Sequence, residues 1–435
     1  MQQLLSLFSN VTELTWQMPV MWAIGAILIY LGIVKKMEPA LLVPMGFGAI
    51  LVNLPLSGAV TQIDKITGET EVGAIDVLFN AGIANELFPL LLFIGIGAMI
   101  DFTPLLSNPK MMLFGAAAQF GIFFTLSMAC LFGFDLTDAA SIAIIGAADG
   151  PTSIFVANYF NSKYVGAIIV AAYSYMALVP IVQPPVIKLV TTRKERLIRM
   201  PYAQRPVSKT LGSNYIGAIA VAAYSYMALV PIIQPFAIKL VTTKKERAIR
   251  MPYRPQGVTR RMRILFPIIV SIIAGLVAPS SVALVGFLMF GNLVRECGVL
   301  GSLSETAQNA LANLITLLLG LTVATKMQAA YFLRWETLLI MGLGLVAFVF
   351  DTAGGVVFAK ILNLFLPKGR KLNPMIGAAG ISAFPMSARV INRLGLEEDP
   401  ENFLLMHAVG ANVSGQIASV IAGGLVLTLV PMFLK

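Results

Sequence analysis

Apolar runs close to the length that crosses a bilayer recur along the whole chain of 435 residues, separated by short polar clusters. In lipid every backbone polar group must be paired internally, so only α-helices and closed β-barrels can span it. The alternating segments of about ten residues that a barrel requires are not found in the sequence. Charged residues make up only 12% of the chain, about half the fraction of a soluble protein. The sequence therefore predicts an all-α polytopic membrane protein in a lipid bilayer.

Hydropathy divides the chain into about ten to twelve predicted transmembrane segments. They are apolar stretches bounded by polar or turn residues, and we place them at about 19–34, 40–56, 88–100, 111–132, 139–160, 165–190, 215–241, 264–293, 310–324, 337–366, 374–392 and 403–433. The stretch 264–293 is interrupted by "APSS", which leaves one helix or two open. The first run ends at Lys35 and Lys36, which predicts an uncleaved first helix that enters the cytoplasm.

The formal net charge of +10 is concentrated in loops such as "TTRKERLIRM" and "TTKKERAIRM". Membrane proteins retain Lys and Arg on the cytoplasmic side, so these loops explain the positive charge without a nucleic-acid partner. We expect no nucleic acid to bind this chain.

One unit of the chain occurs twice in tandem. Gly166–Tyr202 returns with few changes as Gly217–Tyr253, inside what we otherwise interpret as a single membrane-embedded transporter domain over residues 1–435. The tandem duplication lies within 166–253, and each copy holds one apolar segment followed by a basic loop.

The second copy creates a topological conflict, because both loops that flank its apolar segment 215–241 are strongly basic. A single crossing would put one basic loop on the wrong side of the membrane. Either the second copy does not cross, or it folds back at Pro231 and Pro235, or the rest of the chain inverts. We expect one copy to be non-spanning or hairpin-like.

Two apolar segments contain a helix breaker of the same kind. They are "IIGAADGPTSIF" (Ile144–Phe155) and "NPMIGAAGISAFPMSAR" (Asn373–Arg389), and both combine "IGAA" with a proline and small hydroxyl residues. They lie in the two halves of the chain, as the matching broken helices of an internally repeated transporter do. We therefore predict two broken helices in halves related like an inverted repeat.

The breaks predict a cation site. In a helix, Pro151 frees the carbonyl of Ala147 and Pro385 frees that of Ile381, because proline has no N–H. Free carbonyls in lipid need protein, water or an ion as a partner. Together with the carboxylate of Asp149, they form a set of hard oxygen ligands that suits an alkali or alkaline-earth cation.

The second segment offers further polar groups. Asn373 and Gly377 are four residues apart, and Ser382 and Arg389 are seven apart, so each pair can share one helix face. The planar guanidinium of Arg389 suits a carboxylate, which points to coupling between a cation and an anionic substrate. The last helix adds Asn412 at membrane depth.

Structural explanations compete with these roles. Asp149 could pair with a basic residue inside the bundle, although intramembrane carboxylates are costly to keep. Arg389 could mark a cytoplasmic helix end, and Ser382 could be a packing residue. Asp351, in "FDTAGG", is a secondary candidate that could instead lie near an interface. A phenol of the Tyr173 and Tyr175 pair could pack in the bundle or pass a proton.

Together the motifs resemble one family. The stretches that carry the resemblance are "KKMEPALLVPMGFG", "NPKMMLFGAAAQFG", "GAADGPT", "VAAYSYMALVPIVQPP", "GNLVRECGV", "GAAGISAFPMSARV" and "NFLLMHAVGANVSG", which cover nearly the whole chain. They resemble the membrane β subunit of biotin-dependent, sodium-pumping decarboxylases, which act on oxaloacetate, methylmalonyl-CoA, glutaconyl-CoA or malonate. The resemblance implies sodium-translocating decarboxylation of carboxybiotin, with export of Na+ and consumption of a proton from outside.

The resemblance also implies roles for single residues. Asp149 would bind Na+ with Asn373, Ser382 and Asn412 as further ligands, and Arg389, Ser382 and Gly377 would bind the substrate. The catalytic residues would be Arg389, Tyr175 and Asp149. The family has the "AAYSYMALVP" segment once, and here the first copy follows the Asp149 helix directly. We therefore assign the tyrosine role to Tyr175 and keep Tyr226, with Asp351, as a secondary candidate.

Partner subunits follow from the resemblance. The chain has no biotin-attachment motif of the Met-Lys-Met type, so no covalent cofactor is expected on it. A biotin-carrying carboxyltransferase α subunit would supply carboxybiotin and would choose the acid, and a small membrane γ subunit would complete the complex. A multi-pass location in a prokaryotic inner membrane is implied, and a homo-oligomer is left open.

Two other functions stay open at this point. A cation-coupled secondary transporter of an organic anion would share the broken helices but would need no decarboxylation and no biotin carrier. An intramembrane aspartyl protease would use Asp149 and Asp351, but the sequence lacks its Gly-x-Gly-Asp type of motif. Co-purification with a biotinylated protein would favour the decarboxylase, and anion uptake by this chain alone would favour the transporter.

Overall fold

The computed structural model describes residues 12–34, 38–63, 68–198, 258–367, 371–399 and 402–434. The second copy of the repeat lies outside these residues. The expectations for segment 215–241, for its path and for Tyr226 therefore fall on residues that the structure does not describe.

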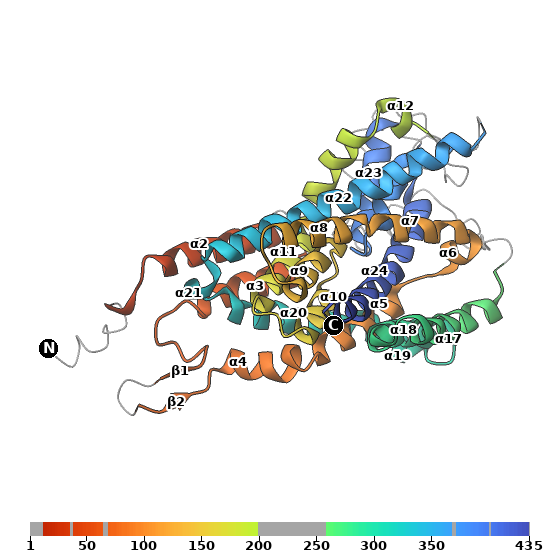
Figure 1. The fold of residues 1–435 in the computed structure, drawn as a ribbon. Coiled ribbons are helices and arrows are strands. Elements are labelled where there is room, and N and C mark those ends of the chain that lie inside the picture. The colour runs from red at the N-terminus through yellow and green to blue at the C-terminus, as the bar shows by residue number, and fades with distance from the viewer. Residues whose placement is uncertain are drawn as a thin grey trace, which may run out of the picture.

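The first part of the described chain consists of helices and one minimal hairpin. The elements are α2 (Gln17–Ile33), α3 (Pro39–Leu51), β1 (Gln62–Ile63), β2 (Thr70–Glu71), α4 (Ala74–Phe79), η2 (Asn80–Ala84), α5 (Leu87–Met99), α6 (Thr103–Ser107), η3 (Pro109–Met111), α7 (Met112–Ala118), α8 (Phe120–Leu131), α9 (Leu136–Ala143), η4 (Ile144–Ala147), α10 (Gly150–Tyr159), α11 (Val165–Val190) and α12 (Arg193–Arg196). β1 and β2 pair antiparallel, with Gln62 opposite Glu71 and Ile63 opposite Thr70. Figure 1 shows this hairpin and α21 at the end of the molecule opposite to α12.

The remaining described elements are all helical. They are α17 (Arg260–Val277), η5 (Pro279–Ser281), α18 (Val282–Glu296), α19 (Gly301–Thr306), η6 (Ala307–Leu311), α20 (Ala312–Val323), η7 (Ala324–Met327), α21 (Ala329–Phe332), α22 (Trp335–Phe365), η8 (Pro374–Gly380), α23 (Met386–Glu398) and α24 (Leu405–Phe433). Apart from the short hairpin, the prediction of an all-α fold is confirmed for the described residues.

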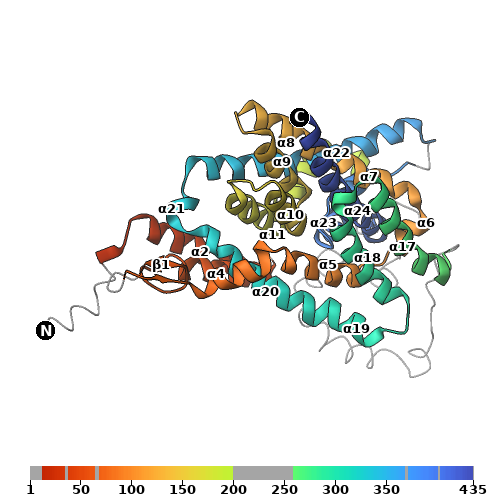
Figure 2. The same cartoon turned by 60° about the horizontal axis from the view of Figure 1, so that its bottom comes forward.

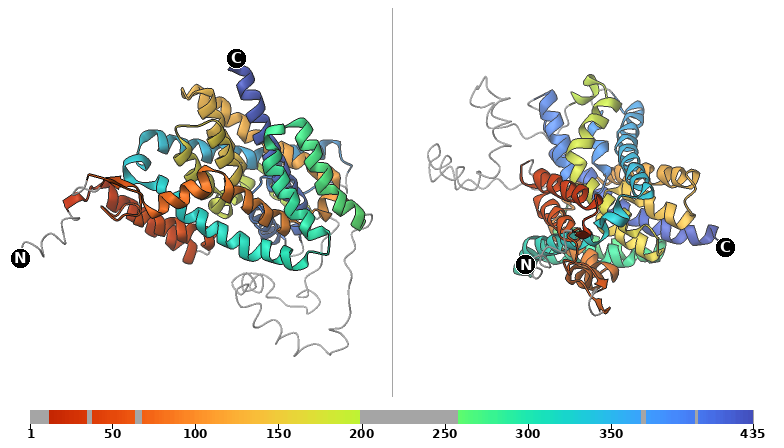
Figure 3. Two further views of the ribbon diagram at one scale, coloured as in Figure 1. Left: turned by 90° about the horizontal axis from the view of Figure 1, so that it is seen from below. Right: turned by 90° about the vertical axis from the view of Figure 1, so that its left-hand side faces the viewer.

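The interrupted run 264–293 forms two helices. Proline and serine at "APSS" start a new turn, because proline fits the first positions of a helix and not its interior. α17 and α18 therefore fold back on each other around η5, and Figure 3 shows them side by side in its left view.

Four helical stretches of the described chain are long and apolar enough to cross a membrane. They are 109–131, 301–327, 335–365 and 405–433, and a fifth forms if the bent pair 74–84 and 87–99 counts as one span. Large apolar side chains are exposed on the outer helices, such as Leu276 of α17 at 80%. In water such a surface would be a liability, whereas a bilayer solvates it.

The largest buried cluster surrounds the two interrupted segments. Residues 144–148 and 375–381 are all buried, and the apolar side chains among them are at most 1% exposed. They lie among α7, α22 and α24. Figure 2 shows α9, α10 and α11 grouped next to α22. The breaks in the chain are therefore placed at the centre of the molecule.

Candidate functional site

The first broken segment interrupts its helix in front of Asp149. α9 tightens into the 3-10 turn η4, Ala148 takes a left-handed conformation (φ 53°), and Asp149 is extended before α10 starts at Gly150. Pro151 stands in the first turn of α10, where its missing N–H costs no hydrogen bond. The predicted break is confirmed, and it makes Asp149 the N-cap of a new helix.

Asp149 is buried and hydrogen-bonded on both oxygens. Its Oδ1 accepts from the Thr152 N–H at 3.4 Å, and its Oδ2 accepts from the hydroxyls of Thr152 at 2.7 Å and of Ser419 at 3.1 Å. Within the described ranges no basic side chain forms an ion pair with it. The alternative that Asp149 pairs with a bundle lysine or arginine therefore finds no support in this part of the chain.

The second broken segment departs from the predicted helix 374–392. Residues Pro374–Gly380 form the 3-10 helix η8, residues 381–385 are irregular, and α23 starts only at Met386. The predictions that Asn373 and Gly377 share a helix face, and that Ser382 and Arg389 do, are wrong. A 3-10 helix has three residues per turn, so residues four apart such as Asn373 and Gly377 do not lie above one another. Ser382 precedes α23, so it is not on the same helix as Arg389.

The two broken segments are hydrogen-bonded to each other. The carbonyl of Ala147 accepts from the backbone N–H of Ser382 at 3.2 Å and from its hydroxyl at 2.6 Å. The carbonyl of Ile381 accepts from the side-chain amide of Asn412 at 2.7 Å. Both carbonyls predicted to be free thus lie outside regular helix hydrogen bonding, and polar groups of the other broken segment and of α24 are their partners.

Several buried oxygens on α24 and α11, the helices that contact Asp149 and Gly150, have no hydrogen-bond partner among the described residues. They are the Asn412 side-chain oxygen, the Gln416 side-chain oxygen and the Tyr173 hydroxyl. The ring of Tyr173 lies against Gly150, because a Cβ on this glycine would be 2.4 Å from the Tyr173 Cζ. Unpaired polar atoms are costly in a protein interior, so a partner for these oxygens is expected.

α24 presents its polar side chains along one face. Asn412, Gln416 and Ser419 follow the spacing of three and four residues that places side chains above one another on a helix. Ser419 contacts Asp149 and Asn412 contacts the second segment. With Asp149 this face forms a candidate site for a hard cation such as Na+, whose preferred ligands are oxygens.

Tyr175 lies outside this group of contacts. Its hydroxyl donates to the carbonyl of Met341 on α22, and its ring packs on Gly344. Tyr173, two residues earlier, points to a different side of α11, since successive helix positions differ by about 100°. The structure therefore brings Tyr173, and not Tyr175, next to Asp149.

Asn373 and Gly377 are bound to other parts of the chain. The Asn373 amide donates to the carbonyls of Arg196 at 2.7 Å and Ile198 at 2.9 Å. η8 rises about 2 Å per residue, which separates Asn373 from the Ser382 end of the segment by roughly 15 Å. Gly377 forms a close backbone crossing with Gly355 of α22, because a Cβ on Gly377 would lie 2.0 Å from the Gly355 oxygen.

Arg389 is exposed on α23 and lies near the carboxylate of Glu38, at the start of α3. Burial raises the pKa of Glu38, and the positive charge of Arg389 acts against that shift. Arg389 forms no hydrogen bond with the Asp149 group in the part of the chain that the structure describes. It offers an accessible cation at the beginning of the helix that follows the second broken segment.

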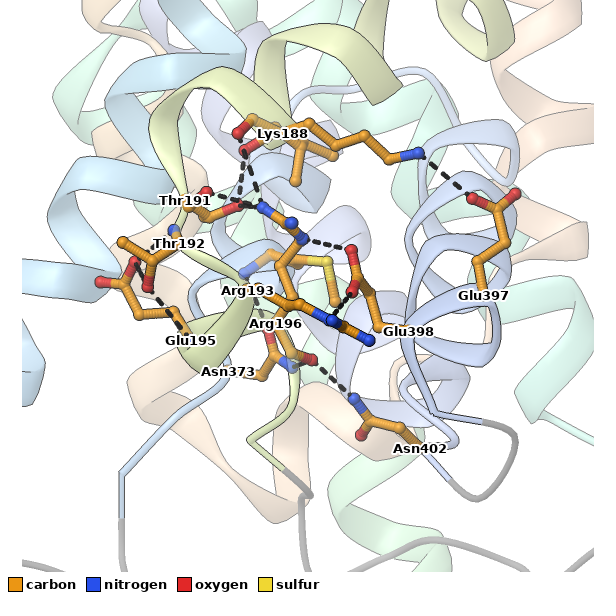
Figure 4. Close-up of polar contacts among 12 residues, drawn as sticks. Lys188, Thr191, Thr192, Arg193, Glu195, Arg196, Asn373, Glu397, Glu398 and Asn402 are labelled. Atoms are coloured by element: carbon orange, nitrogen blue, oxygen red, sulfur yellow. Dashed lines mark hydrogen bonds and ion pairs between the residues drawn. The ribbon is translucent and has the colours of Figure 1, made fainter.

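A polar network fastens the loop after α11 to the second broken segment (Figure 4). Arg196 pairs with Glu398 of α23 at 2.5 Å, and its carbonyl accepts from both Asn373 and Asn402. Lys360 of α22 pairs with Glu195 at 3.2 Å. The basic loop of the first copy therefore holds three elements together at one end of the molecule.

We expect Glu398→Gln to loosen this network. Both side chains of the Arg196–Glu398 pair are only 13% exposed, so loss of the charge should cost roughly 1–3 kcal/mol, between the values for exposed and buried pairs. The matched control is Lys188→Gln, whose pair with Glu397 is about half exposed. Thermal unfolding of the purified protein should show a clear loss for Glu398→Gln and almost none for the control; equal losses would contradict the role of the network.

Thr152 and Ser419 contact Asp149 without having been selected from the sequence as site residues, and Tyr173, which adjoins it, was named only as one of a pair of which Tyr175 was chosen. Thr152 could have been found as the residue three positions after an N-cap carboxylate. Ser419 continues the polar spacing that begins at Asn412. No local signal distinguishes Tyr173 from Tyr175, because both stand in the same largely apolar stretch of α11. Asp351 lies near the middle of α22 and is fully buried. The alternative that it lies near an interface stays a prediction.

The chain matches known proteins over nearly its full length. Residues 17–212 and 207–430 both match the family model of the Na+-transporting oxaloacetate decarboxylase beta subunit, and each match contains one copy of the repeat. The chain is 42% identical over 422 residues to the glutaconyl-CoA decarboxylase subunit beta of Acidaminococcus fermentans, covering 97% of this chain and 96% of that protein. It is 43% identical over 410 residues to the methylmalonyl-CoA decarboxylase subunit beta of Veillonella parvula, covering 94% of this chain and 92% of that protein. It is 39% identical over 482 residues to the oxaloacetate decarboxylase beta chain of Haemophilus ducreyi, covering 98% of each chain.

Proposed function

The chain belongs to the family of the Na+-transporting oxaloacetate decarboxylase beta subunit, and from this premise we propose how its residues couple decarboxylation to Na+ export. Carboxybiotin, carried by a partner subunit, is the substrate, and Na+ is the transported ion. Family membership favours this function over a secondary transporter without decarboxylase activity. The protein is an integral membrane protein.

The hydrogen bonds that join the two broken segments to each other and to α24 carry the proposal. Ser382 donates to Ala147, and α24 donates to Ile381 through Asn412 and to Asp149 through Ser419, so these groups lie in one buried region. Asp149 supplies the negative charge for Na+, and the unpaired oxygens of Asn412 and Gln416 supply neutral ligands. Such oxygen sites at broken helices are the usual ion sites of transporters.

Arg389 is proposed to bind the carboxylate of carboxybiotin. Its guanidinium is accessible and offers the planar fork that a carboxylate prefers. When the N–CO2 bond breaks, the electron pair stays on the biotin nitrogen, which then takes up one proton. A proton that reaches Asp149 from outside would neutralise the carboxylate and release Na+. Asp149 would thus link proton uptake to the release of Na+. Tyr173, whose ring packs against Gly150 next to Asp149, is proposed to pass such a proton.

The complex is proposed to contain a biotin-carrying carboxyltransferase α subunit and a small membrane γ subunit. The α12 end, rich in Lys and Arg, would face the cytoplasm, where the biotin carrier approaches. Ten to twelve crossings stay part of the proposal, because apolar helices of 10–17 residues, such as 17–33 and 39–51, join the longer spans. Asn373 and Tyr175 do not contact the Asp149 group, and would support the site by holding the segments that form it.

The experiment that tests this function is Na+-dependent release of CO2 from carboxybiotin by the purified complex. The protein is reconstituted in vesicles with its biotin-carrying and small membrane partners, and 22Na+ transport is followed with CO2 release. Na+-stimulated release with coupled Na+ movement is expected. Na+-driven uptake of an organic anion by this chain alone, without CO2 release, would instead establish the transporter.

Deletion of residues 203–253 is expected to leave the activity intact. The deletion removes the second copy and joins Tyr202 to Arg254. Both copies end in "RMPY", so the new junction has the same local sequence as Tyr253–Arg254 in the full chain. Each of the two family matches contains one copy. Na+-stimulated CO2 release should therefore be at least as fast as in the full chain. The reciprocal deletion of 166–216 tests whether the copies are interchangeable; an inactive 203–253 deletion beside an active full chain would show that the second copy is needed.

A further inference from the structure

A buried glutamine of α11 joins this helix to both parts of the second broken segment. The side-chain amide of Gln183 donates to the carbonyl of Ala378 in η8 at 2.6 Å and to the hydroxyl of Ser387 in α23 at 2.7 Å. The Ser387 hydroxyl lies 3.0 Å from Gln183 Oε1 and 3.2 Å from the Ala378 oxygen, and it donates its proton to one of them. The three groups therefore form one hydrogen-bonded cluster.

The amide of Gln183 stands where α11 has lost hydrogen bonds of its own. Pro184 and Pro185 follow it directly, and because proline has no N–H, two hydrogen bonds of the helix are missing here. Gln183 is fully buried. A polar side chain in an apolar interior is unfavourable unless its hydrogen bonds are made, so the bonds to η8 and α23 account for an amide at this position.

The cluster closes the irregular part of the second broken segment. Ala378 and Ser387 are nine residues apart, and the stretch between them contains Ser382, whose hydroxyl donates to the Ala147 carbonyl. Gln183 binds both ends of this stretch. The start of α23 is therefore fixed relative to η8 and to α11, although the residues in between form no regular helix.

Arg389 depends on this fixed start. It follows Ser387 by two residues, in the first turn of α23, and its side chain is exposed. At the other end of α23, Glu398 pairs with Arg196 of α12, which follows α11. α23 is thus attached to the α11–α12 segment at both ends, and the attachment next to Arg389 is the one that Gln183 makes.

We propose that Gln183 is a positioning residue for carboxybiotin, which acts through Ser387 to hold Arg389 where it binds the carboxylate. The inference rests on the proposed function, because it takes Arg389 as the carboxylate-binding group. The Asp149 group has a separate hydrogen bond to α24 through Ser419. Loss of the Gln183 amide should therefore weaken the binding of carboxybiotin and leave the binding of Na+ unchanged.

The test varies the concentration of free carboxybiotin at saturating Na+ and follows CO2 release by the purified complex. Gln183→Met keeps an unbranched side chain of similar size and removes the hydrogen bonds. KM for carboxybiotin should rise about tenfold, or about 1.4 kcal/mol, as for the loss of a buried hydrogen bond. kcat should change little, because Arg389 holds the carboxylate both before and during bond cleavage. The Na+ concentration for half-maximal stimulation should stay that of the wild type.

Gln119→Met is the matched control. Gln119 is also buried, and its amide donates to the carbonyls of Gly115 at 2.9 Å and Gly380 at 3.5 Å. These bonds reach α7 and η8 and not α23, so KM for carboxybiotin should equal that of the wild type. A purely structural role of Gln183 would raise KM and the Na+ requirement together, and that result would overturn the proposal.

Ser387→Ala tests the path through which Gln183 is proposed to act. KM should rise about threefold, because the amide still bonds to Ala378. The double variant should not exceed Gln183→Met, since both changes interrupt one path, and a KM that rises by the product of the single effects would overturn action through Ser387. If Gln183→Met does not fold, Ser387→Ala decides, and its KM at the wild-type value would overturn the proposal.

The wild-type complex separates this inference from the function on which it rests. Absence of Na+-stimulated CO2 release from the wild type would overturn the proposed function, and this inference with it. Wild-type release together with an unchanged KM in Gln183→Met would overturn the positioning role alone.

Discussion

Asp149→Asn is expected to abolish Na+-stimulated CO2 release from carboxybiotin. The side chain is buried between Thr152 and Ser419 and is the negative charge proposed to hold the ion. A buried charge pair that loses one member loses about 3–5 kcal/mol, and about 1.4 kcal/mol corresponds to tenfold. Affinity for Na+ should therefore fall by roughly a hundredfold or more.

The variant should fold, which makes the result interpretable. Asparagine keeps the volume of the side chain and one oxygen that can accept from Thr152. The matched control is Asp138→Asn. Asp138 is also buried, but it accepts from Ser162 at 2.7 Å and pairs with Lys163, away from the broken segments. The control should keep its dependence on Na+. Wild-type stimulation by Na+ in Asp149→Asn would remove Asp149 from the ion site.

Gly377→Ala is expected to destabilise the centre of the molecule. The new Cβ would lie 2.0 Å from the carbonyl oxygen of Gly355, and both atoms belong to backbone segments that cannot rotate away. α22 and η8 would have to separate, at a cost on the order of 3 kcal/mol for overpacking. Because η8 leads to Ser382, the hydrogen bond to the Ala147 carbonyl should weaken as well, and activity should fall with stability.

Gly342→Ala is the matched control on α22. A Cβ on Gly342 meets nothing within 4 Å, and alanine is favoured over glycine in a helix by about 1 kcal/mol. Thermal unfolding and Na+-stimulated CO2 release should both decline in Gly377→Ala and stay unchanged or improve in Gly342→Ala. A stable, active Gly377→Ala protein would mean that the close crossing with Gly355 is not required.

Local features of the sequence were sufficient to predict a series of apolar helices and the places where two of them break. Apolar length and helix breakers placed several of the described helices within a few residues, as for the predicted 165–190 and the observed Val165–Val190. They failed for 374–392, where α23 starts only at Met386, and for 310–324, whose helical stretch begins at Gly301. The break before Pro151 and the irregular stretch before Pro385 follow from the missing N–H of proline. Asp149 was identifiable because a carboxylate beside a helix break is costly in lipid and is kept for a purpose.

The partners of these groups depended on the tertiary structure. The sequence could not indicate that the Asn373 amide bonds to the loop of Arg196, or that Ser382 donates to Ala147. Nor could it select Tyr173 over Tyr175, since a helix that is apolar on all sides carries no stripe to show which face meets which neighbour. In this protein the sequence by itself determined the membrane environment, the broken helices and the charged residue between them. Only the packing of segments far apart in the chain decided which oxygens surround that charge, because the largely apolar surfaces around the polar groups do not show which segments meet.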